Sequence, residues 1–293
     1  MSGRQAISPS VMLQPTTAQK AGRAALILLA LLLLAGSLIL PVIAVFTQAL
    51  SQGWRMYRDS IHQQDVLSAL RLTGLVACIA VPLNMAFGIA ASWAITRFEF
   101  HGKNLLITLI DIPLAVSPVV AGLMYIEVFG LHGWLGPWLS EHNLHVIFAV
   151  PGIVLATVFV TFPFVARELI PFMQAQGSDE EIAAVVLGAN GWSVFWRITL
   201  PNIKWALLYG TILAASRSIG EFGAVSVVSG HIRGRTTTLP LQVEMLYNEY
   251  NFTAAFAAAS LLTLAAIVTL ILKKTIEVTS GMHRHMDEKE DDL

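Results

Sequence analysis

Two charged residues lie in an otherwise apolar segment of the chain. Arg217 and Glu221 are four residues apart, a spacing that places two side chains on one face of a helix. An unpaired charge inside a membrane is costly, so such residues normally have a function or a partner. Arg217 could attract a passing divalent anion, whereas a mutual ion pair would order helix packing and cancel most of that attraction. Both interpretations stay open, and Gly220 and Gly223 permit close helix approach or a local break beside the pair.

Recognisable catalytic motifs are absent from the sequence. It contains no Gly-x-x-x-x-Gly-Lys-Ser/Thr phosphate loop, no His-Glu-x-x-His and no Gly-x-Ser-x-Gly. We therefore expect a non-catalytic protein that binds no metal or cofactor itself, so that any ATP would be used by a partner. A membrane enzyme is one alternative, but it would need a cluster of titratable groups at one depth in the membrane, and only Arg217 and Glu221 come near that. A secondary transporter would normally show more buried carboxylates and an internal repeat of its spans, and we find neither.

The composition is that of a membrane protein. Hydrophobic residues make up 55% of the chain, charged residues make up 13%, and the mean hydropathy is +0.67. Soluble domains contain roughly 25% charged residues, and a soluble fold of this size could not cover so much apolar surface. The net charge of -1 provides no basic field for nucleic acid. The single cysteine, Cys78, excludes an intrachain disulfide.

Six segments are long and apolar enough to cross a hydrocarbon core of roughly 30 Å as helices. They are residues 24–47, 67–93, 104–129, 146–169, 204–229 and 254–272. The sequence thus predicts an all-α, polytopic membrane protein with a six-span domain at 20–275, a flexible tail at 1–19 and a charged tail at 276–293. With both termini in the cytoplasm, most Lys and Arg of the connections are cytoplasmic, and the translocated connection 130–145 has none.

A polar, glycine-containing segment connects the fourth and fifth of these spans. Ser178 with Glu181 three residues later is a capping-box pattern, which predicts a short helix beginning at Asp179. Gly188 is placed to end that helix as the residue after the cap. The predicted helix is apolar on one side and too short to cross a membrane, which is typical either of a lipid-facing connector or of a surface for a partner.

This segment resembles the EAA loop of ABC-transporter permeases, in which Glu-Ala-Ala, three residues, Gly, nine residues and Ile-x-Leu-Pro follow one another. The matching residues are Ala183, Ala184, Gly188, Ile198, Leu200 and Pro201. Ile182 occupies the position of the motif glutamate, and Glu181 comes one residue earlier. Since one residue turns a side chain by about 100° on a helix, the sequence favours a capping role for Glu181. The resemblance implies a cytoplasmic coupling loop at 171–203 on which a separate ATPase subunit pushes.

The resemblance covers nearly the whole chain outside the N-terminal tail. Residues 200–210 and 217–230 are similar to the sulfate, thiosulfate and molybdate branch of these permeases. Within that branch, Val-Ser-Val-Val-Ser-Gly at 225–230 and Thr-Leu-Pro-Leu-Gln at 238–242 look most like the CysW-type subunit of sulfate/thiosulfate importers.

This resemblance implies a type I ABC importer in the bacterial inner membrane that works by alternating access. The implied partners are a second related permease, a pair of ATPase subunits that bind the ATP, a periplasmic sulfate/thiosulfate-binding protein and membrane lipid, with no nucleic acid. Molybdate or another oxyanion is the alternative substrate, because selectivity is expected to lie mainly in the binding protein.

Overall fold

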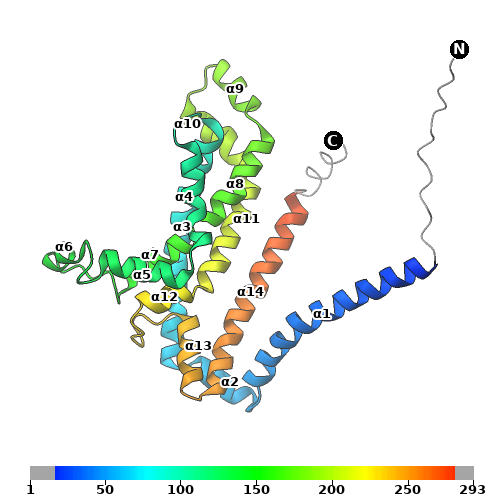
Figure 1. Ribbon diagram of the computed structural model, residues 1–293, viewed down its shortest axis with the longest axis vertical. Helices are drawn as coiled ribbons and strands as arrows, with labels where there is room; N and C mark the ends of the chain where they lie inside the picture. The colour runs from blue at the N-terminus through cyan, green and yellow to red at the C-terminus, as the bar shows by residue number, and fades with distance from the viewer. Residues whose placement is uncertain (1–16, 281–293) are drawn as a thin grey trace. The chain divides into compact units, whose positions relative to one another are not determined.

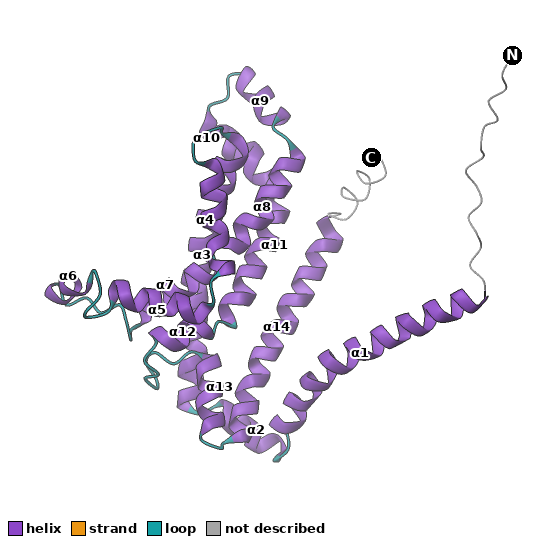
Figure 2. Cartoon of the chain, in the orientation of Figure 1, coloured by secondary structure: helices purple, strands orange, loops and turns teal. Residues whose placement is uncertain are grey.

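The computed structural model describes residues 17–280 of the chain. Within that range helices joined by loops and turns are the regular secondary structure and no strand is present, which confirms the all-α prediction (Figure 2). The first helix, α1, runs from Thr17 to Ala49, and the last, α14, runs from Phe252 to Ser280. The predicted tails therefore fall mostly outside the described residues.

Four segments are long and apolar enough to cross a membrane by themselves. They are Gly22–Ala49 within α1, Gln64–Arg97, which is helix α3, Val150–Gln176, and Phe252–Thr279 within α14. The third of these consists of α7 (Val150–Thr161) and α8 (Pro163–Gln176), which meet at Phe162. These segments correspond to the first, second, fourth and sixth predicted spans.

The third predicted span, 104–129, is a bent pair of helices. Helix α4 (Lys103–Ala115) and helix α5 (Pro118–Phe129) meet at an angle of 109° and count as a fifth span only when taken together. Pro118 opens α5 and disfavours a helical conformation at the residue before it, so Ser117 is extended with ψ 134°. Hydropathy alone does not detect this bend.

The prediction of a continuous fifth span at 204–229 is wrong. Helix α11 (Leu200–Ile219) ends before Gly220, and the short helix α12 (Gly223–Val228) follows. Lys204, Arg217 and several other polar side chains lower the hydropathy of α11, which is not among the segments that qualify as a span alone. Both expected uses of the glycines occur. Helix α11 ends before Gly220, and the backbone at Gly223 approaches another helix closely, since a Cβ added there would lie 2.9 Å from Cβ of Pro118.

Helices α3, α7, α8 and α11 pack side by side (Figure 1). Glycines allow two of these contacts to be close. A Cβ at Gly88 of α3 would lie 2.6 Å from Cγ1 of Val165 on α8, and a Cβ at Gly210 of α11 would lie 3.1 Å from Cα of Val165. Around them, Leu169, Met173 and other side chains of α8 and α11 form a buried apolar cluster. This bundle is a tightly packed unit in which small shifts are resisted.

The remaining helices are short. They are α2 (Gly53–Ile61), α6 (Gly136–Glu141), α9 (Asp179–Val186), α10 (Gly191–Val194), the π-helix η1 (Phe195–Thr199) and α13 (Leu239–Asn248). Helix α2 packs on α14, where the hydroxyls of Tyr57 and Ser260 are 3.0 Å apart. Helices α9, α10 and η1 connect α8 to α11, and the EAA-like pattern runs from Ala183 in α9 to Pro201 in the first turn of α11.

Candidate functional site: a loop between spans and a buried ion pair

Helix α9 begins and ends where the sequence predicts. It starts at Asp179 and ends with Leu187 as its C-cap, followed by Gly188 at φ +89°. The N–H of Gly188 donates to the carbonyl of Val185 (2.9 Å), and the N–H of Ala189 donates to that of Ala184 (3.0 Å). This pair of hydrogen bonds is a Schellman motif, whose left-handed residue is normally glycine. Gly188 is therefore required for its backbone conformation, since a Cβ there would have nothing within 4 Å.

The capping-box prediction for Glu181 is wrong. Ser178 makes no side-chain capping hydrogen bond among the described residues. Glu181 instead faces the end of α3, where its Oε2 accepts from Nε of Arg97 (2.7 Å) and its Oε1 accepts from Nη2 of Arg97 (3.2 Å). Oε1 also accepts from the hydroxyl of Thr199 (2.8 Å). A charge-assisted, two-point bond to a guanidinium is stronger than a bond to a neutral backbone N–H, which explains the preference.

The opposite side of α9 is an exposed apolar surface. Within the described part of the chain, α9 buries none of its residues. Ile182 is 56% exposed, Val186 80% and Leu187 87%, while Ala183 is exposed and Ala184 is half-buried. A contiguous exposed apolar patch is typical of an interaction site. The side chain at the motif position, Ile182, therefore belongs to this surface, whereas Glu181 does not.

The second half of the loop returns the chain to the bundle. The side chain of Asn190 caps α10 by accepting from the N–H of Ser193 (2.7 Å). Ile198 is half-buried in η1, Leu200 packs against the apolar cluster between α8 and α11, and Pro201 lies in the first turn of α11. Nδ2 of Asn202 donates to Oε2 of Glu180 (2.6 Å), so the loop's two halves are joined.

Arg217 and Glu221 form an ion pair, with Nη1 2.7 Å from Oε2. The Glu221 side chain is only 1% exposed, and that of Arg217 is 35% exposed. The expectation that both lie on one helix is wrong, because α11 ends at Ile219 and Glu221 lies in the break before α12. Oε1 of Glu221 accepts from the N–H of Ala224 (3.0 Å), so the carboxylate links the end of α11 to the start of α12.

A small cavity of about 60 Å³ lies beside this break, between α11 and α14. It is lined by Ser216, Ile219, Gly220, Leu262, Ala265, Ala266 and Thr269. Most of these side chains are apolar and none of them is cationic, so this cavity does not form a cage for an oxyanion.

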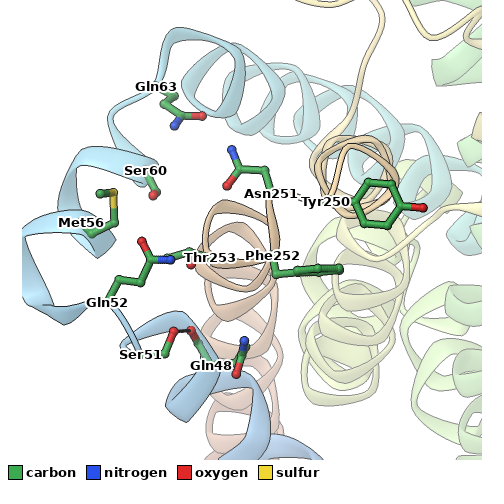
Figure 3. Close-up of a pocket in the computed structure, with 10 residues that line it drawn as sticks. All are labelled: Gln48, Ser51, Gln52, Met56, Ser60, Gln63, Tyr250, Asn251, Phe252 and Thr253. Atoms are coloured by element: carbon green, nitrogen blue, oxygen red, sulfur yellow. Dashed lines mark hydrogen bonds between the residues drawn. The ribbon is translucent and has the colours of Figure 1, made fainter.

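A larger cavity of about 260 Å³ lies where α2 meets the connection between α13 and α14 (Figure 3). Neutral hydrogen-bonding side chains dominate its lining: Gln48, Ser51, Gln52, Ser60, Gln63, Asn251 and Thr253. In Figure 3 the side chains of Gln52 and Ser60 point across the cavity toward Thr253. No charged residue is among its described lining, so it would not concentrate a dianion. Sequence reasoning missed this cavity because its residues come from separate segments without a shared motif.

Together, the helical bundle and the loop define a permease subunit with the type I ABC importer fold. Residues 85–277 match the family described as the binding-protein-dependent transport system inner membrane component, and the chain belongs to that family. It is a multi-pass membrane protein and a non-catalytic transport subunit, whose ATPase is a separate chain.

Individual relatives place the chain more narrowly. It is 55% identical over 256 residues to the sulfate transport system permease protein CysW of Escherichia coli K12, covering 87% of this chain and 88% of that protein. It is 34% identical over 244 residues to the sulfate transport system permease protein CysT of the same strain, with 83% and 88% covered. The chain is therefore a permease of the CysW type.

A solved structure of a bacterial alginate ABC transporter in complex with a periplasmic protein is similar in fold. The TM-score is 0.73 at 15% sequence identity, over 90% of this chain and 95% of that chain. At this identity the comparison supports the architecture alone.

Proposed function

We propose that this chain is a transmembrane permease subunit of an ATP-driven importer of sulfate and thiosulfate in the bacterial inner membrane. The observation that carries the proposal is the 55% identity to a CysW sulfate permease across most of both chains. The two charged residues near the end of α11 neutralise each other, so the chain offers no isolated cation there to select a dianion. Selection of the oxyanion is accordingly assigned mainly to a binding protein.

The proposed assembly contains a second permease of the CysT type, two ATPase subunits that bind ATP, and a periplasmic binding protein. Similarity to both CysW and CysT supports a pair of related permeases. We place both termini and the loop at 171–203 in the cytoplasm, because the cytoplasmic connections then hold most of the Lys and Arg. The exposed apolar side of α9 is the proposed docking surface for an ATPase subunit.

The proposed mechanism is alternating access driven by that surface. Closure of the ATPase pair on ATP would displace α9, which is tied to α3 through Glu181 and to α11 through Glu180 and Asn202. Since α3, α8 and α11 are close-packed, they would tilt together rather than deform. The path between the two permeases would then open to the binding protein and receive its oxyanion.

Uptake of labelled sulfate, thiosulfate and molybdate tests this function directly. We compare cells that lack only this chain with the same cells after the chain is restored. Sulfate and thiosulfate uptake should be lost and then recovered, while molybdate uptake stays unchanged. A defect restricted to molybdate would replace the proposed substrate, and normal uptake of all three oxyanions would refute the proposal.

A further inference from the structure

We propose that Arg97 is a positioning residue for energy coupling: it holds Glu181 so that a displacement of α9 is passed to α3 and α8. The inference rests on the proposed function and extends it to a residue outside the EAA-like pattern. Arg97 is the last residue of α3, and 84 positions separate it from Glu181.

The Arg97 guanidinium joins three elements. Two of its nitrogens bind the two carboxylate oxygens of Glu181, at 2.7 and 3.2 Å. The third, Nη1, donates to the carbonyl of Met173 on α8 (3.2 Å). The side chains of Arg97 and Glu181 are 10% and 15% exposed, respectively, so the pair is weakly screened by salt. A planar guanidinium bound at three points is held in one orientation.

Glu181 adds a fourth element to this cluster. Its Oε1 also accepts from the hydroxyl of Thr199, which is 1% exposed and ends η1. π-helical turns are uncommon and occur frequently at functional sites. The carboxylate is thereby bonded both to the end of α3 and to the segment that leads into α11.

Few other contacts hold α9 to the bundle. Because α9 buries no residue, apolar packing does not anchor it. A further side-chain bond from its first turn joins Glu180 to Asn202 at an exposed position. A force applied to the apolar side of α9 would therefore reach the spans mainly through Glu181 and Arg97.

The same geometry explains the departure from the EAA pattern. A glutamate at position 182 would share the exposed side of α9 with Val186, whereas position 181 is turned toward α3. The chain thus separates two tasks between neighbouring residues. Ile182 contributes to the partner surface, and Glu181 connects that surface to the bundle.

The test uses the full complex of this chain with its second permease, the ATPase pair and the binding protein, reconstituted in lipid. Sulfate transport and ATP hydrolysis are measured on the same preparation, so that their ratio reports coupling. Arg97→Gln should keep the ATPase bound, keep ATP hydrolysis within about twofold of wild type, and lower sulfate transported per ATP at least tenfold. The conservative variant Arg97→Lys keeps the charge but not the two-point geometry. Its sulfate transported per ATP should lie between the values for wild type and Arg97→Gln.

Two further variants separate coupling from simple stabilisation. Exchange of the charges, Arg97→Glu with Glu181→Arg, should recover part of the transport that either single change removes. Asp179→Asn is the matched control, since it alters an exposed carboxylate in the first turn of the same helix and should leave the transport-to-ATP ratio unchanged. Loss of the ATPase from the Arg97→Lys complex would overturn the proposal, because the pair would then merely shape the docking surface. A wild-type ratio in Arg97→Gln would overturn it as well.

A second readout does not depend on the transported substrate. Cys78, the only cysteine of this chain, lies on α3 and can hold a fluorophore in an assembly whose partners lack cysteine. ATP should change its fluorescence in the wild-type complex and fail to do so in Arg97→Gln. An ATP response without sulfate transport in the wild type would refute the proposed substrate while leaving the role of Arg97 intact. Equal responses in the two complexes would refute the role of Arg97.

Discussion

Glu221 is fully buried beyond the end of α11 and shares its carboxylate between Arg217 and the N–H of Ala224. The carboxylate therefore links two helices across the non-helical residues between them, rather than two turns of one helix. An ion pair in this position stabilises the conformation of the residues between the two helices. The same carboxylate neutralises the charge of Arg217 and accepts a hydrogen bond from an N–H in the first turn of α12, which has no partner within that helix. This arrangement favours a structural role for the pair over an anion site.

Removal of the Glu221 charge alone should lower the yield of assembled complex more than removal of the charges of both Arg217 and Glu221. Glu221→Gln leaves Arg217 without its counter-charge. Loss of one partner of a fully buried pair costs about 3–5 kcal/mol, and the cost here is smaller because the Arg217 side chain is 35% exposed to solvent. We expect at least a fivefold lower yield of assembled complex for Glu221→Gln, measured by co-purification, and recovery of most of that yield in Arg217→Gln with Glu221→Gln. A double variant that assembles normally but transports no sulfate would instead assign Arg217 to the anion path.

The apolar side of α9 should be sensitive to charge. Val186→Asp places a carboxylate at the centre of the proposed ATPase surface, where it would have to be desolvated. Co-purification of the ATPase should fall at least tenfold. Val278→Asp is the control, because Val278 is 72% exposed at the end of α14 and lies outside this surface. Equal retention of the ATPase by both variants would argue against the docking surface.

Close packing between α3 and α8 makes a prediction about stability. Gly88→Ala adds a methyl group 2.6 Å from Cγ1 of Val165, and overpacking of this kind typically costs about 1–3 kcal/mol. Gly74→Ala on the same helix meets nothing within 4 Å and should be neutral or slightly stabilising. Thermal unfolding of the purified complex in detergent should show a lower midpoint for Gly88→Ala alone. Identical midpoints would show that the bundle relaxes around this glycine.

The features that could be predicted from the sequence are those whose signals are local. Helix α9 has its stop signal, Gly188, within two residues of its last helical residue, and its length followed directly. The role of Glu181 could not be predicted, because Arg97 lies 84 residues away and competes successfully with the local capping pattern. The pattern of Ser178 and Glu181 thus predicted the start of α9 correctly and the hydrogen-bond partner of Glu181 wrongly.

The breaks within the spans were missed for a different reason. Averages of hydropathy over about 20 residues identify apolar length but not backbone direction. Pro118 and Gly220 mark the two breaks in the sequence, yet both residue types also occur within continuous membrane helices when neighbours satisfy the backbone. Contacts such as Gly223 against Pro118 and Glu221 against Ala224 stabilise the broken form, and they depend on the tertiary fold.

Gly188 is the residue whose replacement tests the shape of the candidate coupling loop. Its φ of +89° is unfavourable for any side chain with a Cβ, and a β-branched residue there costs of order 1 kcal/mol or more. Gly188→Val should therefore displace the end of α9 and abolish sulfate uptake while the protein still reaches the membrane. Membrane abundance by immunoblot and uptake of labelled sulfate measure the two effects separately.

Gly191→Ala supplies the matched control for this substitution. Gly191 begins α10 three residues later, does not have a positive φ, and has no atom within 4 Å of an added Cβ. Its replacement should leave uptake near the wild-type level, because neither backbone conformation nor space opposes a methyl group there. If Gly188→Val transported sulfate as well as Gly191→Ala does, the left-handed turn after α9 would have no part in coupling, and force would have to reach the spans without it.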